Sequence, residues 1–230
     1  MVTSLKERHP AHEKAPAVAR PDAQGGEIAS LDRRIRACRI CRDMPLGAPL
    51  EREPNPVFTL SNTARICIAG QAPGNLADRS GRPFTDPSGV RLRAWMGVGE
   101  AVFYDAARIN IVPMGFCFPG TDPKGGDRPP RPECRQRWHG EVFAAMPRLE
   151  LILAVGRAAQ LWHLGKAGLA GRSVAEVLDL WRAGAGEVRE GPTILPLPHP
   201  SWRNSGWISR NPWFEETILP ELRRRIARLL

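Results

Sequence analysis

The sequence contains no long apolar segment and no internal repeat. None of its apolar runs approaches the ~20 residues that a helix needs to cross a bilayer. Residues 1–27 also lack the apolar core of a secretory signal, and their proline, alanine, glycine and charged residues are typical of a disordered segment. We therefore expect a disordered tail over residues 1–27 and one domain over residues 28–230, in a monomeric cytoplasmic protein that does not bind membranes.

Lysine is scarce, whereas arginine is abundant. Only four of the 33 Lys and Arg residues are lysines, the formal net charge is +9 and the sequence pI is about 10.2. An excess of arginine favours a polyanionic partner such as nucleic acid, because guanidinium groups neutralise phosphates and release counterions. The alternative is a solvated basic surface in a protein from an arginine-biased genome.

The sequence has no G-x-S-x-G nucleophile elbow, which gives no support to an α/β hydrolase with a serine nucleophile. It has five cysteines, and in a cytoplasmic protein these indicate a metal site or buried thiols rather than disulfides. Cys38 and Cys41 form a C-x-x-C pair, and Cys117 and Cys134 flank a loop rich in proline and glycine. Cys67 lies within an apolar run and is expected in the core.

Short apolar runs alternate with longer helix-like segments along the chain. The runs predict strands at residues 63–70, 107–114, 150–156 and 192–198. Helices are expected around residues 29–46, 87–98, 132–149, 157–165 and 211–230, whereas residues 173–184 fit either a helix or a loop. This alternation predicts a single-domain, three-layer α/β/α fold with a mostly parallel four-stranded central sheet.

Three loops that follow strands contain most of the polar residues of interest. Because ligands of parallel sheets bind beyond the carboxyl ends of the strands, loops 70–89, 110–132 and 199–211 are expected on one rim. The first contains the glycine-rich turn "GQAPG" and an isolated aromatic residue, Phe84. The second begins with Asn110, whose amide pairs either with a ligand such as a base edge or with local backbone.

The third rim loop, "HPSWRNSGWISRN", interleaves tryptophan with arginine. This combination suits stacking on bases and contact with phosphates. The alternative is a tryptophan-rich packing loop under the last helix.

Four ordered motifs, "GQAPG", "GRPFTDPSG", "NIVPMGFC" and "LPHPS", resemble those of the uracil-DNA glycosylase superfamily, especially its iron–sulfur branches. The resemblance implies a DNA-repair enzyme of that fold. Such an enzyme flips uracil or another deaminated base out of DNA and hydrolyses its N-glycosidic bond, leaving an abasic site.

The resemblance also assigns roles to individual residues. Phe84 would stack on the flipped base, Asn110 would bind its edge, and His199 would stabilise the departing uracil anion. The first motif, Gly70, Gln71 and Ala72, would line the base site, and Gln71 is also a catalytic candidate that could orient the attacking water through its carbonyl oxygen, although it is no base.

The same resemblance places the loop after His199 in the minor groove of the duplex. Trp202 or Arg203 is the candidate wedge, and Ser88, Ser201 and Asn204 are expected to contact DNA. The partner would be DNA that contains uracil or another deaminated base.

The cysteines fit the iron–sulfur branches as well. Cys38, Cys41, Cys117 and Cys134 would hold a 4Fe–4S cluster with a structural role, the alternatives being zinc or no metal.

One position departs from the family pattern. The iron–sulfur relatives have a glutamate where this chain has Gln71, and the archetypal branch has an aspartate at the position of Ala72. A carboxylate there orients the attacking water and stabilises positive charge on the sugar. Asp78 is the preferred replacement and Asp86 the second candidate, although Asp78 could instead cap a turn. The chain is therefore expected to be a monofunctional glycosylase, or alternatively a non-catalytic binder of uracil or abasic DNA.

Overall fold

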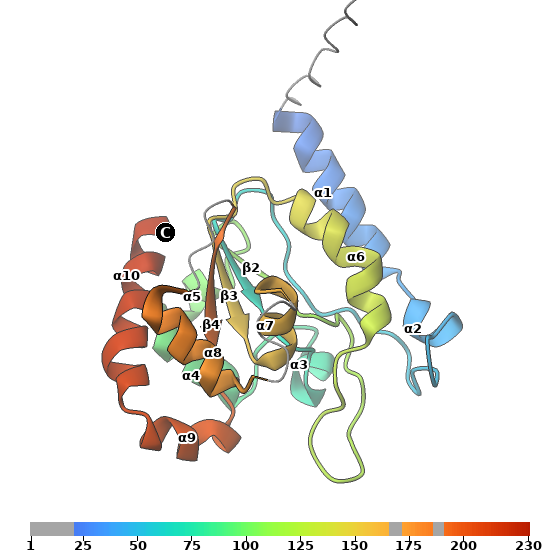
Figure 1. Cartoon of the computed structure of the whole chain (residues 1–230). Helices are drawn as coiled ribbons and strands as arrows, with labels where there is room; N and C mark the ends of the chain where they lie inside the picture. The colour runs from blue at the N-terminus through green and yellow to red at the C-terminus, as the bar shows by residue number, and fades with distance from the viewer. Residues whose placement is uncertain (1–20, 166–171, 186–190) are drawn as a thin grey trace, which may run out of the picture.

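A computed structural model describes residues 21–165, 172–185 and 191–230 of the chain (Figure 1). Most of the expected disordered tail, residues 1–20, lies outside this part. Residues 21–27 belong to the first helix, α1, so the helical part of the chain begins before the boundary expected at residue 27.

The helices and strands alternate after an initial helical pair. The helices are α1 (Pro21–Arg36), α2 (Ile40–Asp43), α3 (Asn75–Ser80), α4 (Pro87–Met96), α5 (Glu100–Phe103), α6 (Pro132–Ala144), α7 (Arg157–His163), α8 (Val174–Leu180), α9 (Ser205–Arg210) and α10 (Leu219–Leu229). The strands are β1 (Ile66–Ala69), β2 (Ile109–Ile111), β3 (Leu151–Val155) and β4 (Thr193–Leu197). Short π-helical turns follow α8 and precede α10, and a 3₁₀ turn, Trp202–Asn204, precedes α9.

The four strands form one parallel sheet in the order β2-β1-β3-β4, as the sequence predicts. The expected helix at residues 29–46 is divided into α1 and α2. The segment 173–184, which the sequence left open, is helical: α8 begins with a capping box in which Ser173 and Glu176 exchange hydrogen bonds.

Side chains alternate between the two faces of the sheet and give it two separate cores. Ile66 and Ile68 of β1 pack in the core under α4, α5 and α10, whereas Cys67 and Ala69 pack under α1, α6 and α7. Figure 1 shows these two groups of helices on opposite sides of the strands, so the structure has the three layers expected from the sequence. In the described part of the chain no helix is long and apolar enough to span a membrane.

Candidate active site

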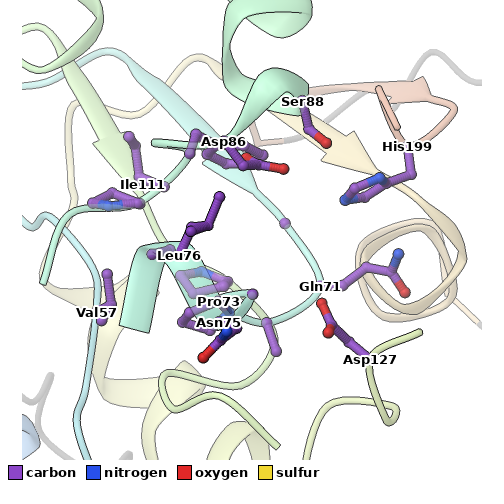
Figure 2. A pocket seen from close by; sticks show the side chains of 17 residues that line it. Val57, Gln71, Pro73, Asn75, Leu76, Asp86, Ser88, Ile111, Asp127 and His199 are labelled. Carbon is purple, nitrogen blue, oxygen red and sulfur yellow. The ribbon is translucent and has the colours of Figure 1, made fainter. Parts of the chain in front are cut away.

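A pocket opens at the carboxyl ends of the strands, where the sequence analysis placed the ligand site. It has a volume of about 210 Å³ and is bounded by loops that follow β1, β2 and β4 (Figure 2). The residues that line it are Val57, Gly70, Gln71, Ala72, Pro73, Gly74, Asn75, Leu76, Ala77, Pro83, Phe84, Asp86, Ser88, Ile111, Pro113, Asp127 and His199. The expectation that the three loops share one rim is confirmed.

Phe84 forms one wall of the pocket in a strained backbone conformation. Its φ of 54° is in the left-handed region, which non-glycine residues rarely adopt. The Tyr104 hydroxyl lies 3.0 Å from both the Pro83 and the Phe84 carbonyl oxygens. On the other side, a Cβ at Gly89 would lie 1.8 Å from the Phe84 oxygen. The Tyr104 hydroxyl therefore anchors the backbone at Phe84, and the absence of a side chain at Gly89 leaves room for the Phe84 carbonyl.

His199 follows β4 and also lines the pocket. Its Nδ1 accepts a hydrogen bond from the Ser201 N–H at 3.3 Å, and its carbonyl accepts one from the Asn204 amide at 2.7 Å. Burial lowers the pKa of His199, and the Asp86 charge opposes this only in part. The imidazole is therefore neutral at pH 7, and because Nδ1 is an acceptor, Nε2 carries the proton.

Gln71 is held at both its backbone and its side chain. Its carbonyl accepts the Gly115 N–H at 2.9 Å. Its Nε2 would lie 3.1 Å from a Cβ at Gly156, which has a φ of 79°, so the amide packs against a position that only glycine accommodates. Gln71 is thus a fixed neutral group in the pocket.

Two carboxylates line the pocket, Asp86 and Asp127. Burial raises the pKa of Asp127, the Asp86 charge raises it further, and Arg203 lowers it. Figure 2 shows the Asp127 carboxylate directed into the pocket, whereas the Gln71 amide is turned away from it. Asp127 belongs to none of the four sequence motifs. Its only signal was an acidic residue directly after Gly125-Gly126 in a long irregular loop.

Asp78, the preferred replacement for the missing acid, does not line the pocket. It is 6% exposed, its carboxylate pairs with Arg52 at 3.1 Å, and its carbonyl accepts a hydrogen bond from Asn55 at 2.6 Å. Asp78 therefore fastens α3 to the segment before β1. This corrects its assignment as the group that orients the water.

Asn110, expected to bind the base edge, also lies outside the pocket wall. Its Nδ2 donates to the Ser61 carbonyl at 2.8 Å and contacts the Met146 sulfur at 2.9 Å. The register pairs Asn110 with Cys67, so its side chain is on the α6 face of the sheet, whereas Ile111 faces the pocket. The structure therefore corrects the placement of Asn110 and supports the other reading, a bond to local backbone.

The expected DNA-binding residues lie in and beside the pocket mouth. Ser88 lines the pocket, and Ser201, Trp202, Arg203 and Asn204 form the turn that follows His199.

Both wedge candidates are exposed, but they differ in their contacts. Trp202 is 77% exposed, the highest value among the exposed large hydrophobic residues of the described chain. The Arg203 guanidinium instead lies against Gly126, where a Cβ would be 2.9 Å from Nη1. Arg91 fastens the turn through the Ser201 carbonyl and the Ser205 hydroxyl, each at 3.1 Å.

The four cysteines outside the sheet gather around one small cavity. Cys38, Cys41, Cys117 and Cys134 line it, whereas Cys67 is buried in β1. Within the described residues, however, no group of three or more His, Cys, Asp or Glu side chains is arranged to hold a metal ion.

Two of these sulfur atoms accept hydrogen bonds. The Phe116 N–H donates to Cys134 Sγ and the Trp138 indole N–H donates to Cys38 Sγ, both at 3.2 Å. Such bonds stabilise charge on sulfur and are found around thiolates that bind iron.

Comparison with known families agrees with this geometry. A family model described as the uracil DNA glycosylase superfamily matches residues 58–223. The match covers more than half of the 230 residues and includes every strand and the whole pocket except Val57. A strained aromatic residue and a neutral histidine thus line one pocket on the expected three-layer fold, and the chain belongs to the uracil DNA glycosylase superfamily.

Proposed function

We propose that the protein is a DNA-repair glycosylase that hydrolyses the N-glycosidic bond of uracil in DNA. The observation that carries this proposal is the pairing of Phe84 with a neutral His199 across a pocket of about 210 Å³. That volume is below the ~300 Å³ at which pockets for drug-sized ligands begin, and it suits a single base. A base must leave the duplex to enter such a pocket.

The pocket offers a stacking wall and a hydrogen-bond donor to the flipped base. Phe84 is fixed before the substrate arrives, so little conformational entropy is lost when a base stacks on it. As the bond between C1′ and N1 breaks, its electron pair moves onto the base, and negative charge develops at the base oxygens. The Nε2–H of His199 is available to stabilise that charge without a proton transfer.

Base selection falls to the polar groups that line the pocket. Because Asn110 does not line the pocket, the neutral polar side chains available to the base edge are Gln71, Asn75, Ser88 and His199. Uracil is the proposed substrate, and hypoxanthine and xanthine are the nearest competitors.

The proposal is tested with oligonucleotides that carry one uracil, hypoxanthine or xanthine. After incubation with the full chain, alkali cleaves every abasic site, and strand scission at uracil is the expected result. Binding to uracil-containing or abasic DNA without scission at any of the three bases would instead identify the alternative function, a non-catalytic binder.

Trp202 is the proposed wedge, because Arg203 is already packed against Gly126. We expect Trp202→Ala to slow uracil excision from duplex by about 10- to 100-fold, the equivalent of one lost stacking contact. Excision from single strands should change little, since no partner base has to be replaced. Trp162→Ala is the matched control, an exposed tryptophan on α7 that does not line the pocket. Equal losses on both substrates would contradict a wedge role.

We also propose that Cys38, Cys41, Cys117 and Cys134 hold a 4Fe–4S cluster. The four thiols share one cavity, and two of them accept N–H bonds. A tetrahedral zinc site draws its sulfurs within ~2.3 Å of one ion, whereas a cluster binds each thiolate at a different iron. The choice of a cluster over zinc rests on the resemblance of the motifs to the iron–sulfur branches of the family. When bound, it would join α1, α2 and α6 to the loop after β2.

Iron content tests the cluster. Purified without oxygen, the protein should be coloured and contain iron, and Cys117→Ser should remove most of both. Cys67→Ala, which changes a thiol outside the cavity, should retain both. Colourless native protein without iron, or equal iron in the two variants, would contradict the assignment.

A further inference from the structure

The pocket contains a carboxylate that the sequence motifs do not account for. Gln71 is neutral and so cannot act as a base, and Asp78 is paired with Arg52 outside the pocket. Asp127, from the loop after β2, also lines the pocket, and Figure 2 shows its carboxylate directed into it.

Resting on the proposed function, we propose that Asp127 is the carboxylate that holds and deprotonates the attacking water. It takes over the role of the acid that the family resemblance leads us to expect at position 71.

A small hairpin places Asp127 precisely enough for this role. Thr121 and Asp127 form an antiparallel bridge, and the Asp122 N–H donates to the Gly126 carbonyl at 2.8 Å. Gly125 and Gly126 have φ values of 88° and 95°, which allow the tight reversal. The Asp127 carboxylate thereby enters the pocket beside Gly74, where its Oδ2 would lie 3.2 Å from a Cβ.

Asp86, the other pocket carboxylate, is less suited to the water. It stands at the N-terminus of α4 and raises the pKa of both His199 and Asp127. Figure 2 places it on the α4 side of the pocket with Ser88, away from Gln71. The main effect of Asp86 is therefore on the protonation of His199 and Asp127.

In the proposed step, water replaces the base at C1′ of the sugar. The water oxygen forms a bond to C1′ while the bond from C1′ to N1 breaks and its electron pair leaves with the base. The Asp127 carboxylate takes the proton from the water, and the anionic base takes up a proton from solvent after it is released. Gln71, through its carbonyl oxygen, can accept the second hydrogen of the water, so an amide is sufficient at that position.

The charges around Asp127 make the pH dependence specific. Asp86 faces it from the start of α4, Arg203 from the turn after β4, and His199 from the end of β4. A base must be ionised, so the rate should rise as pH increases through the Asp127 pKa, which burial and Asp86 raise. His199 loses its proton at a lower pH than an ordinary histidine, because its pKa is lowered. It therefore also contributes to the acid limb of the pH–rate profile, the part in which the rate rises with pH.

Two substitutions should move the acid limb in opposite directions. Asp86→Asn removes a negative charge and should shift the limb to lower pH. Arg203→Gln removes a positive charge and should shift it to higher pH. The shift caused by Arg203→Gln is the one specific to Asp127, because Asp86 raises the pKa of His199 as well as that of Asp127. An acid limb that stays in place in Arg203→Gln would overturn the proposal.

The direct test is single-turnover excision of uracil by Asp127→Asn. We expect a loss of about 100-fold, the lower part of the range for a general base, with unchanged affinity for abasic DNA. Asp122→Asn is the matched control, because it removes the same charge from the same hairpin outside the pocket, and its rate should equal that of the native chain. The double variant Gln71→Glu/Asp127→Asn should recover most of the lost rate, since it returns a carboxylate to the water.

The outcomes separate this inference from the proposed function. A native chain that excises uracil, with an Asp127→Asn variant equally fast, would overturn the role of Asp127 and leave the glycosylase intact. A native chain that excises no deaminated base would overturn both.

Discussion

Gly89→Ala is expected to abolish excision and to lower the free energy of unfolding by about 3 kcal/mol, the upper part of the range for overpacking. A Cβ at Gly89 would lie 1.8 Å from the oxygen and 2.7 Å from the carbonyl carbon of Phe84. Both are backbone atoms, so no rotamer change relieves the clash. Phe84 would have to leave its left-handed conformation, and the stacking wall of the pocket would move with it.

Gly140→Ala is the matched control for this prediction. Both glycines lie in helices, but a Cβ at Gly140 has no neighbour within 4 Å. Replacing a helical glycine by alanine in open space is stabilising by up to about 1 kcal/mol. Urea denaturation measures both variants, and uracil excision measures the pocket. Normal excision by Gly89→Ala would show that the position of Phe84 is not needed.

His199→Ala should reduce the single-turnover rate of uracil excision by about 1,000-fold, the upper loss seen when one oxyanion donor is removed. The neutral imidazole, with Nδ1 bonded to the Ser201 N–H, has its remaining N–H directed at the base. Affinity for abasic DNA should remain, because that DNA has no departing base to stabilise.

A second substrate distinguishes leaving-group stabilisation from a general defect. 5-Fluorouracil forms a more stable anion than uracil does, so its departure depends less on stabilisation by the protein. The loss caused by His199→Ala should therefore be smaller on 5-fluorouracil than on uracil. An equal loss on the two bases would mean that His199 acts elsewhere in the reaction.

The sequence predicted the parts of the site that depend on where strands end. Gln71, Phe84 and His199 each follow a strand in a loop with its own motif, and parallel strands bring such loops to one rim. The parallel sheet itself follows from short apolar runs that alternate with helices.

The placements of Asn110 and Asp78 were not predictable in the same way. Asn110 and Ile111 are adjacent in β2, and the register alone decides which of them faces the pocket. Asp78 and Ala77 are likewise adjacent in α3, but only Ala77 lines the pocket. A shift of one residue is smaller than the uncertainty of any motif alignment.

The position of Asp127 could not be predicted from the sequence for a different reason. Its loop has no apolar periodicity that would indicate the direction of a side chain, and its place depends on the Thr121–Asp127 bridge. That bridge joins residues within an irregular segment, and the acid itself belongs to none of the four motifs. Its importance becomes visible only when the charges in the pocket are compared in three dimensions.

The contact of Arg203 with Gly126 joins two loops with different proposed roles, DNA binding and positioning of the water. Arg203 adjoins Trp202 on the turn that would meet the duplex, and Gly126 adjoins Asp127 on the hairpin that would hold the water. A DNA duplex that displaces the turn at Trp202 would therefore also displace the Asp127 carboxylate. Reaction at a base would then require that the DNA strand around the base also be bound in the correct position. The rate would therefore depend on both the base and the DNA that flanks it.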